Sequence, residues 1–306
     1  MSSANLTPEA IEKARKFCID EYKDYIIYKE MAEREKSPRL KEILNKLAEE
    51  EYDHYLFWSK LIGEDCKSEV SKWTIRLLRL SRKIFGLTFT LKFLELHEKE
   101  VIKEYKEYMR YLDEENQKKL QEIIDDEMTH ESRLMEDINE AVVRYLSFIA
   151  LGLADAIVEI SGVHAGFLGA TRTTLVSGVA GLIVGVSAAF AMAGAAYLQA
   201  KAELPTETKG RSPAISALIT GVTYIFSVVL LALPYFLTSH QFTAFVISIL
   251  FAILIVSGFT FYNSVISESS FKRELTENLA ILFGTAFIAY LFGDVIGALF
   301  GLQNVF

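Results

Sequence analysis

Residues that break helices are scarce in the first 140 residues of this 306-residue chain. That part has only two of the five prolines, Pro8 and Pro38, and two of the 17 glycines, Gly63 and Gly86. Pro and Gly are the least favourable residues inside a helix, so their scarcity favours long, uninterrupted helices.

The chain has only two cysteines, Cys18 and Cys66, which is too few for a disulfide scaffold. A reducing cytosol keeps thiols free, so we expect both to be reduced in a cytosolic domain. The N-terminal stretch MSSANLTPEAIEKARKF has no apolar segment, so no cleavable signal peptide is expected.

An excess of basic charge is also missing. The net charge is −8, which gives no footprint for nucleic-acid binding. Of the 72 charged residues, 57 lie in residues 1–140, whereas 15 of the 17 glycines lie in 141–306. We therefore expect an all-α protein with a charged, helical domain at 1–140 and a membrane domain at 141–306, where glycines allow close helix packing.

Five apolar runs are long enough to cross a bilayer of about 30 Å. They cover about residues 145–169, 174–198, 213–237, 243–265 and 278–301. Basic residues gather on the side of Arg144, of the 201–213 loop and of the 269–277 loop. The positive-inside rule therefore predicts a cytoplasmic N-terminus and an external C-terminus.

The first span, around LADAIVEISGVHAG (153–166), carries two carboxylates four residues apart, Asp155 and Glu159. They share one helix face, and acids inside a membrane typically mark an ion or proton pathway. A protonated, hydrogen-bonded structural pair is the alternative. Met192 is a candidate soft ligand on the same path, although a lone Met in a span usually serves packing. Helix packing is the better interpretation of His164, and Asp294 either lines the pathway or pairs with a polar neighbour.

The soluble part is predicted to form four helices, at 8–36, 38–62, 87–113 and 115–141, with Ser37 as a cap of the second. The connecting segment 71–87 holds five basic residues among apolar ones. This pattern is typical of a helix lying on an anionic membrane surface, and a plain structural connector would explain it as well.

An internal repeat is the most informative feature of these helices. Glu21 precedes the E-x-x-H pair Glu51 and His54, and Glu98 precedes a second pair, Glu127 and His130, at nearly the same spacing. In each half a tyrosine, Tyr28 or Tyr105, follows the first glutamate by seven residues. One glutamate from each of two helices plus E-x-x-H from the other two is the ligand pattern of di-iron and di-manganese four-helix bundles. Coincidental spacing on solvated charged faces is the alternative.

Glu95 precedes Glu98 by one turn and is a candidate additional carboxylate, although the first half has Cys18 at the equivalent position. Carboxylates with imidazole suit both iron and manganese, so Fe2+/Fe3+ or Mn2+ is the expected metal.

On Glu21, Glu51-x-x-His54, Glu95-x-x-Glu98 and Glu127-x-x-His130, the soluble part resembles the rubrerythrin branch of the ferritin-like superfamily. The membrane part resembles the vacuolar iron transporter family, through GLADAIV (152–158) and MAGAAYL (192–198). The fusion resembles the membrane-bound ferritins of prokaryotes. This resemblance implies exchange of Fe2+ or Mn2+ for protons in a prokaryotic-type cell membrane. It also implies a homodimer with the pathway between subunits.

These observations predict a transporter that captures cytosolic metal in the soluble bundle and exports it through Asp155, Glu159 and Met192. Two alternatives remain open from the residues. The bundle acts as a membrane-anchored ferroxidase or peroxidase, or it senses metal and gates transport without turnover.

Overall fold

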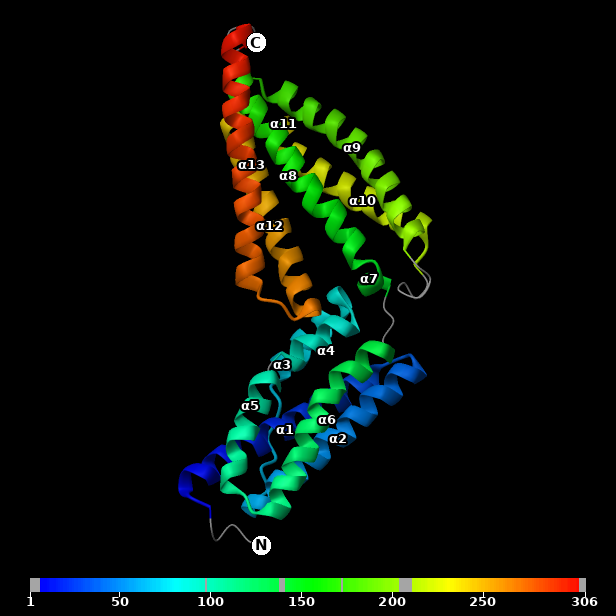
Figure 1. Ribbon diagram of the computed structural model, residues 1–306, viewed down its shortest axis with the longest axis vertical. Helices are drawn as coiled ribbons and strands as arrows, with labels where there is room; N and C mark the ends of the chain where they lie inside the picture. Colours follow the sequence, from blue (N-terminus) through cyan, green and yellow to red (C-terminus); the bar gives the residue numbers. More distant parts are fainter. Residues whose placement is uncertain (1–5, 97, 138–140, 172, 204–210, 303–306) are drawn as a thin grey trace. The chain divides into compact units, whose positions relative to one another are not determined.

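The computed structural model describes the backbone of residues 6–96, 98–137, 141–171, 173–203 and 211–302, all of it helices and their connections (Figure 1). The side chains of residues 95, 98, 99 and 129–137 lie outside the description. The predicted all-α class is confirmed for the described residues. The chain forms two compact units, Met1–Glu140 and Ala141–Phe306.

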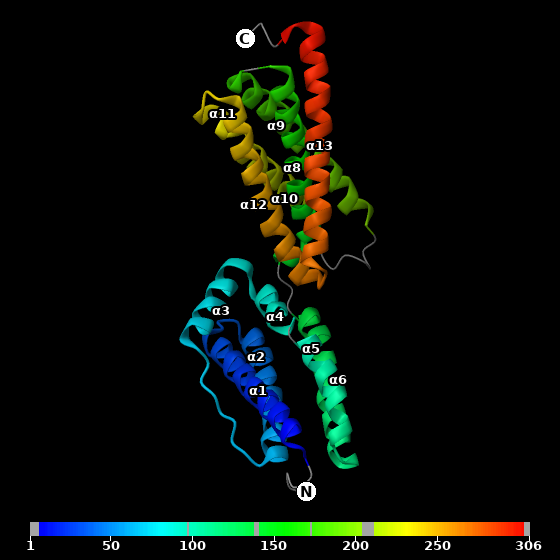
Figure 2. The ribbon, with the colours of Figure 1, turned by 90° about the vertical axis from the view of Figure 1, so that its left-hand side faces the viewer.

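The N-terminal unit is built on a tight antiparallel pair, α1 (Pro8–Arg34) and α2 (Pro38–Ile62), which lie side by side in Figure 2. Both begin with a proline in the first turn and a capping hydroxyl. Ser37 accepts a hydrogen bond from the backbone N–H of Leu40, as the sequence predicts. Gly63 ends α2 in the left-handed conformation, where glycine is unstrained.

The prediction of one continuous helix over residues 87–113 is wrong. This segment consists of α4 (Leu87–Glu95), α5 (Glu98–Tyr108) and a 3₁₀ turn at Met109–Tyr111. The side-chain amide of Gln117 donates to the carbonyls of Met109 and Leu112 at 3.0 Å, which stabilises the end of this turn. Before α4 lies α3 (Lys72–Phe85), and after the turn comes α6 (Glu114–Asp137).

Aromatic side chains from α1, α2 and α5 fill the core that these helices share. Phe17, Trp58, Tyr105 and Tyr108 are all at most 2% exposed, and their rings pack at centroid distances of 4.8–5.8 Å. Leu120 and Ile124 of α6 complete this cluster.

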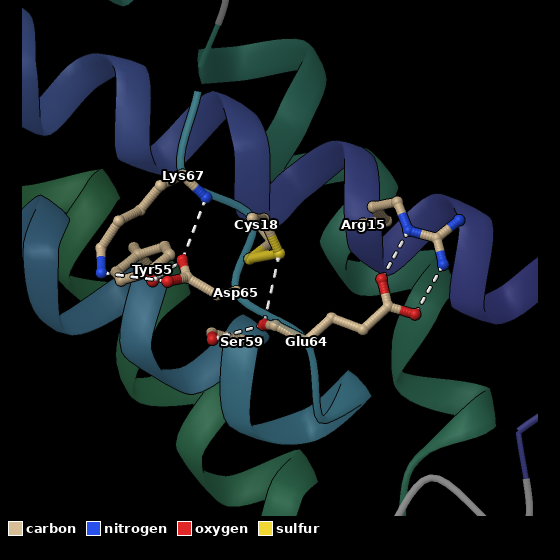
Figure 3. The surroundings of a disulfide bond; sticks show 8 residues. Arg15, Cys18, Tyr55, Ser59, Glu64, Asp65 and Lys67 are labelled. Carbon is tan, nitrogen blue, oxygen red and sulfur yellow. Dashed lines mark hydrogen bonds and ion pairs between the residues drawn. A yellow bond between two sulfur atoms is a disulfide. The ribbon is translucent and has the colours of Figure 1, made fainter. Parts of the chain in front are cut away.

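Cys18 and Cys66 form a disulfide in this core, so the prediction of reduced thiols is wrong (Figure 3). The packing of α1 on α2 brings the two Cα atoms to 5.9 Å, a normal distance for a disulfide. Around it, Arg15 pairs with Glu64 at 2.7 Å, and Tyr55 donates to Asp65 at 2.8 Å. The disulfide therefore fastens the 63–71 connection to α1.

We predict that replacing both cysteines by alanine lowers the free energy of unfolding of the N-terminal unit by up to about 4 kcal/mol. The reason is that the bridge closes a loop with a sequence separation of 48 residues, which restricts the unfolded chain. Denaturant unfolding followed by tryptophan fluorescence of the W73F background, in which only Trp58 remains, measures the effect. An unchanged midpoint with and without reductant in the wild type would contradict it.

The second unit holds five helical segments long and apolar enough to span a membrane, which agrees with the predicted runs. They are α8 (Leu146–Ala170), α9 (Thr174–Ala202), α10–α11 (Pro213–Ala232 and Pro234–Leu237), α12 (Gln241–Ser267) and α13 (Phe271–Phe300). The four-residue helix α7 (Ala141–Arg144) precedes them. The length and composition of these helices are those of an integral membrane domain.

Helix α8 is the centre of the membrane unit and packs against α9, α10, α12 and α13 (Figure 1). Small residues permit the close crossings. A Cβ at Gly293 of α13 would lie 1.9 Å from the Gly166 carbonyl oxygen of α8, and one at Gly152 would lie 2.1 Å from Thr223 Oγ1 of α10. Arg211 donates to the Arg144 carbonyl at 2.9 Å, so the start of α10 is held at the start of α8.

Candidate metal centre and membrane carboxylates

Three helices of the N-terminal unit bring four predicted ligands together. Glu21 comes from α1, Glu51 and His54 from α2, and Glu127 from α6. One ligand atom from each lies within 4.8 Å of all the others. All four side chains are buried, between 2% and 7% exposed. The E-x-x-H spacing places Glu51 and His54 on one face of α2, as the repeat predicts.

The imidazole of His54 is central to the cluster. Its Nδ1 lies 2.9 Å from Glu127 Oε1, and 3.6 Å from both Glu21 Oε2 and Glu51 Oε2. Residues from both halves of the internal repeat therefore meet at one nitrogen atom. Hydrogen bonds from a cationic ring to carboxylates are the strong kind.

Burial determines the protonation of this cluster. It raises the pKa of Glu51 well above the usual value, and the charge of Glu127 adds to the effect. Burial alone would lower the pKa of His54, but the Glu127, Glu21 and Glu51 carboxylates around its Nδ1 outweigh burial and raise that pKa well above the usual value. In the absence of a cation, protons thus balance the buried negative charge.

Two further residues belong to this environment. The Tyr105 hydroxyl donates a hydrogen bond to Glu21 Oε1, and burial raises the pKa of Tyr105 well above its usual value. Asp24, one turn after Glu21, lines the same cavity of about 860 Å3 together with Glu21, Glu51 and Glu127. Burial, followed by the charges of Glu21 and Glu127, raises the pKa of Asp24 well above its usual value. We did not predict Asp24; its i+3 spacing from Glu21 was the available signal.

Three predicted ligands, Glu95, Glu98 and His130, have side chains outside the described residues. Glu95 ends α4, Glu98 begins α5, and His130 belongs to α6. Their roles stay predictions. Tyr28, the first tyrosine of the repeat, is 2% exposed. It packs in a second apolar cluster of this unit, formed mainly by α1 and α2.

The donor set fits a resident metal centre. Three carboxylates and an imidazole converge, and such oxygen and nitrogen donors suit iron and manganese alike. Glu21, Glu51, His54 and Glu127 would hold the metal. A bound pair of metal ions would supply redox chemistry, while the chain orients the ligands.

We predict that Glu51→Gln weakens metal binding by more than about 10-fold, because even loss of a ligand's outer partner typically costs 10–100-fold. Metal content and Mn2+ titration of the purified chain measure this. Glu49→Gln, at an exposed position of the same helix, is the matched control and leaves affinity unchanged. Equal affinity of both variants would contradict the assignment.

Metal affinity is predicted to rise with pH from acidic to neutral conditions and beyond the ordinary titration range of histidine. A metal binds neutral imidazole and ionised carboxylate, so it must displace the protons that the raised pKa values of His54 and Glu51 retain. Calorimetry of Mn2+ binding in buffers of different ionisation enthalpy measures the protons released. Binding without proton release would be inconsistent with this cluster.

In the membrane unit, Asp155 and Glu159 lie one turn apart on α8, and a tyrosine of α10 joins them. The Tyr224 hydroxyl donates a hydrogen bond to Glu159 Oε2 and also lies beside the Asp155 carboxylate. Tyr224 is fully buried, Glu159 is half-buried and Asp155 is exposed. We did not predict Tyr224, since nothing in the sequence distinguishes it from the other 13 tyrosines.

Three other membrane residues were singled out from the sequence. Met192 of α9 is half-buried against the apolar cluster that contains Tyr224. His164 is fully buried, with its ring 4.1 Å from that of Tyr235 and its Nδ1 3.5 Å from Ser248 Oγ, which agrees with a packing role. Asp294 is exposed on α13, where its backbone nitrogen approaches Gly169 of α8.

Comparison with known families gives two matches. Residues 9–137 match Rubrerythrin, and residues 202–294 match the VIT family. Searches of curated proteins and of solved structures give no significant match. The first match covers the whole metal cluster and implies di-iron binding. The second implies metal transport and includes Tyr224, whereas Asp155, Glu159 and Met192 lie outside the matched range.

Proposed function

Because the chain joins a rubrerythrin-type, ferritin-like domain to a VIT-family membrane domain, we propose that it exports Fe2+ or Mn2+ from the cytosol in exchange for protons. The observation that carries this proposal is the buried Glu21, Glu51, His54 and Glu127 cluster in a chain that also has carboxylates inside a membrane span. The soluble cluster captures the cation, and the membrane carboxylates move it.

Asp155 and Glu159 are the residues that carry the cation through the membrane, with Met192 as a softer ligand on the path. A bare carboxylate is costly in hydrocarbon, so each alternates between a metal-bound and a protonated state. Tyr224 supports this role because its hydroxyl holds Glu159 in one orientation. Return of protons then couples metal movement to the pH difference across the membrane.

The cytoplasmic side is the end of the membrane unit that carries Arg144 and Arg211, following the positive-inside rule. Arg211 and Glu203 form an ion pair of 3.4 Å at that end. The Cys18–Cys66 disulfide is compatible with a cytosolic bundle. Cys18 is 0% exposed and Cys66 is 7% exposed, so cytosolic thiols have little access to the sulfur atoms that they would have to attack. The membrane is the cell membrane of a prokaryote.

A homodimer completes the pathway in this proposal. Asp155 is exposed in the single chain, and an exposed carboxylate facing lipid alone would be unstable. A second copy placed against α8 would cover it and bring two sets of Asp155, Glu159 and Met192 together.

We predict that Asp155→Asn and Glu159→Gln each abolish proton-coupled uptake of Fe2+ or Mn2+ into proteoliposomes. Tyr224→Phe slows it by roughly 10-fold, the effect of losing a hydrogen bond to a charged group. Tyr290→Phe, at a 40% exposed position of α13, is the matched control with normal transport. Undiminished transport in both acid variants would overturn the pathway.

The same proteoliposomes distinguish metal export from the enzymatic alternative. A ferroxidase or peroxidase consumes O2 or peroxide in step with Fe2+ oxidation, and Glu51→Gln removes this activity while Asp155→Asn leaves it intact. Transport that is lost in Asp155→Asn, with no consumption of oxidant in the wild type, supports export. Oxidant consumption with no transport in the wild type supports the enzyme.

A further inference from the structure

Helix α3 has apolar side chains on two opposite sides. On the inner side, Leu78 is 8% exposed and packs with Ile75 into the apolar cluster of α1 and α2. On the outer side, the exposed fractions reach 69% for Trp73, 62% for Leu77, 52% for Leu80 and 61% for Ile84. At 100° per residue these last four, the outer stripe, fall within an arc of about 60°.

A plain connector between helices accounts only for the inner side. Besides Leu78, two ion pairs fasten α3 to α1: Arg79 to Glu30 at 3.1 Å, and Arg82 to Glu35. The outer stripe contributes nothing to this attachment. Within the described part of the chain, no side chain covers it, and four large apolar residues in one row are far more than scattered surface hydrophobics.

The border of the stripe is basic. Lys72, Arg76 and Lys83 are exposed along one edge, and the Arg76 guanidinium lies 5.4 Å from the Trp73 ring centroid. The sequence of α3, KWTIRLLRLSRKIF, contains no acidic residue, although the whole chain has a net charge of −8. The face thus combines a tryptophan, three aliphatic side chains and positive charge, which is the composition of interfacial helices.

We propose that the outer stripe of α3 lies on the anionic surface of the bilayer that the same chain spans. The apolar side chains enter the boundary between headgroups and acyl chains, and Lys72, Arg76 and Lys83 contact lipid phosphates. Five membrane spans keep α3 tethered to a bilayer at all times. A second copy of the chain is a poor occupant, because α3 offers no acid to pair with the basic edge of its counterpart.

The chain provides its own probe for this contact. It has two tryptophans, Trp58 in the core at 0% exposure and Trp73 in the stripe. Full-length protein is reconstituted into vesicles of phosphatidylcholine and phosphatidylglycerol with brominated acyl chains. We compare the wild type, W58F, which leaves Trp73, and W73F, which leaves Trp58.

The expected result is loss of most Trp73 emission in W58F, with a blue shift relative to detergent, and little quenching of W73F. Should W58F fail to fold, the difference between the wild type and W73F reports Trp73 alone. Equal quenching of the wild type and W73F, or free access of iodide to Trp73 in vesicles, would overturn the proposal.

A charge-reversal series separates lipid from protein contact. K72E/R76E/K83E is expected to lose most of the Trp73 quenching in anionic vesicles. K41E/K46E/K118E reverses the same number of positive charges at exposed positions of α2 and α6. It is the matched control and is expected to keep full quenching. A blue shift that persists in detergent and depends on protein concentration would identify a second copy as the occupant and refute lipid docking.

Discussion

The cost of burying carboxylates in apolar surroundings is the constraint on which the rest of this structure depends. Glu21, Glu51 and Glu127 are nearly inaccessible to water, and one imidazole, His54, is their common cationic partner. Taking such charges out of water costs several kcal/mol each unless they are neutralised. The bundle therefore holds protons in the cluster or exchanges them for a cation, while the neighbouring aromatic core packs α1, α2, α5 and α6 together.

The membrane unit meets the same constraint with a different solution. Glu159 receives a hydrogen bond from Tyr224, while Asp155 is left exposed on the side of α8. In the soluble cluster, three carboxylates share one imidazole at a buried site, so a cation must displace protons to bind there. In the membrane pair, the exposed Asp155 is the group that the proposed second copy would cover.

The sequence predicts the helices and the ligand spacing well, since both follow from local periodicity. The repeat that begins at Glu21 and Glu98 predicted ligands from four helices. Four of these ligands, from three helices, converge in the structure. Glu98 and His130 stay predictions, because their side chains lie outside the described residues. The interruption between α4 and α5 was not predictable, because neither Pro nor Gly marks it and apolar periodicity continues on both sides. The disulfide was missed for another reason. Its formation depends on a distance between Cys18 and Cys66 that only the packing of α1 on α2 determines.

For helix α3, the amphipathic pattern of the sequence alone does not determine what covers the apolar side. Basic and apolar residues at helical spacing predict a helix with an apolar side, but they do not say whether the protein or its surroundings cover that side. The ion pairs of Arg79 and Arg82 with α1 determine which side faces inward. Once that side is known, Trp73 and Ile84 must point outward, because they lie about half a turn from the inner face. A helix covered on one side by its own bundle and on the other by lipid needs both sets of apolar residues, and α3 has both.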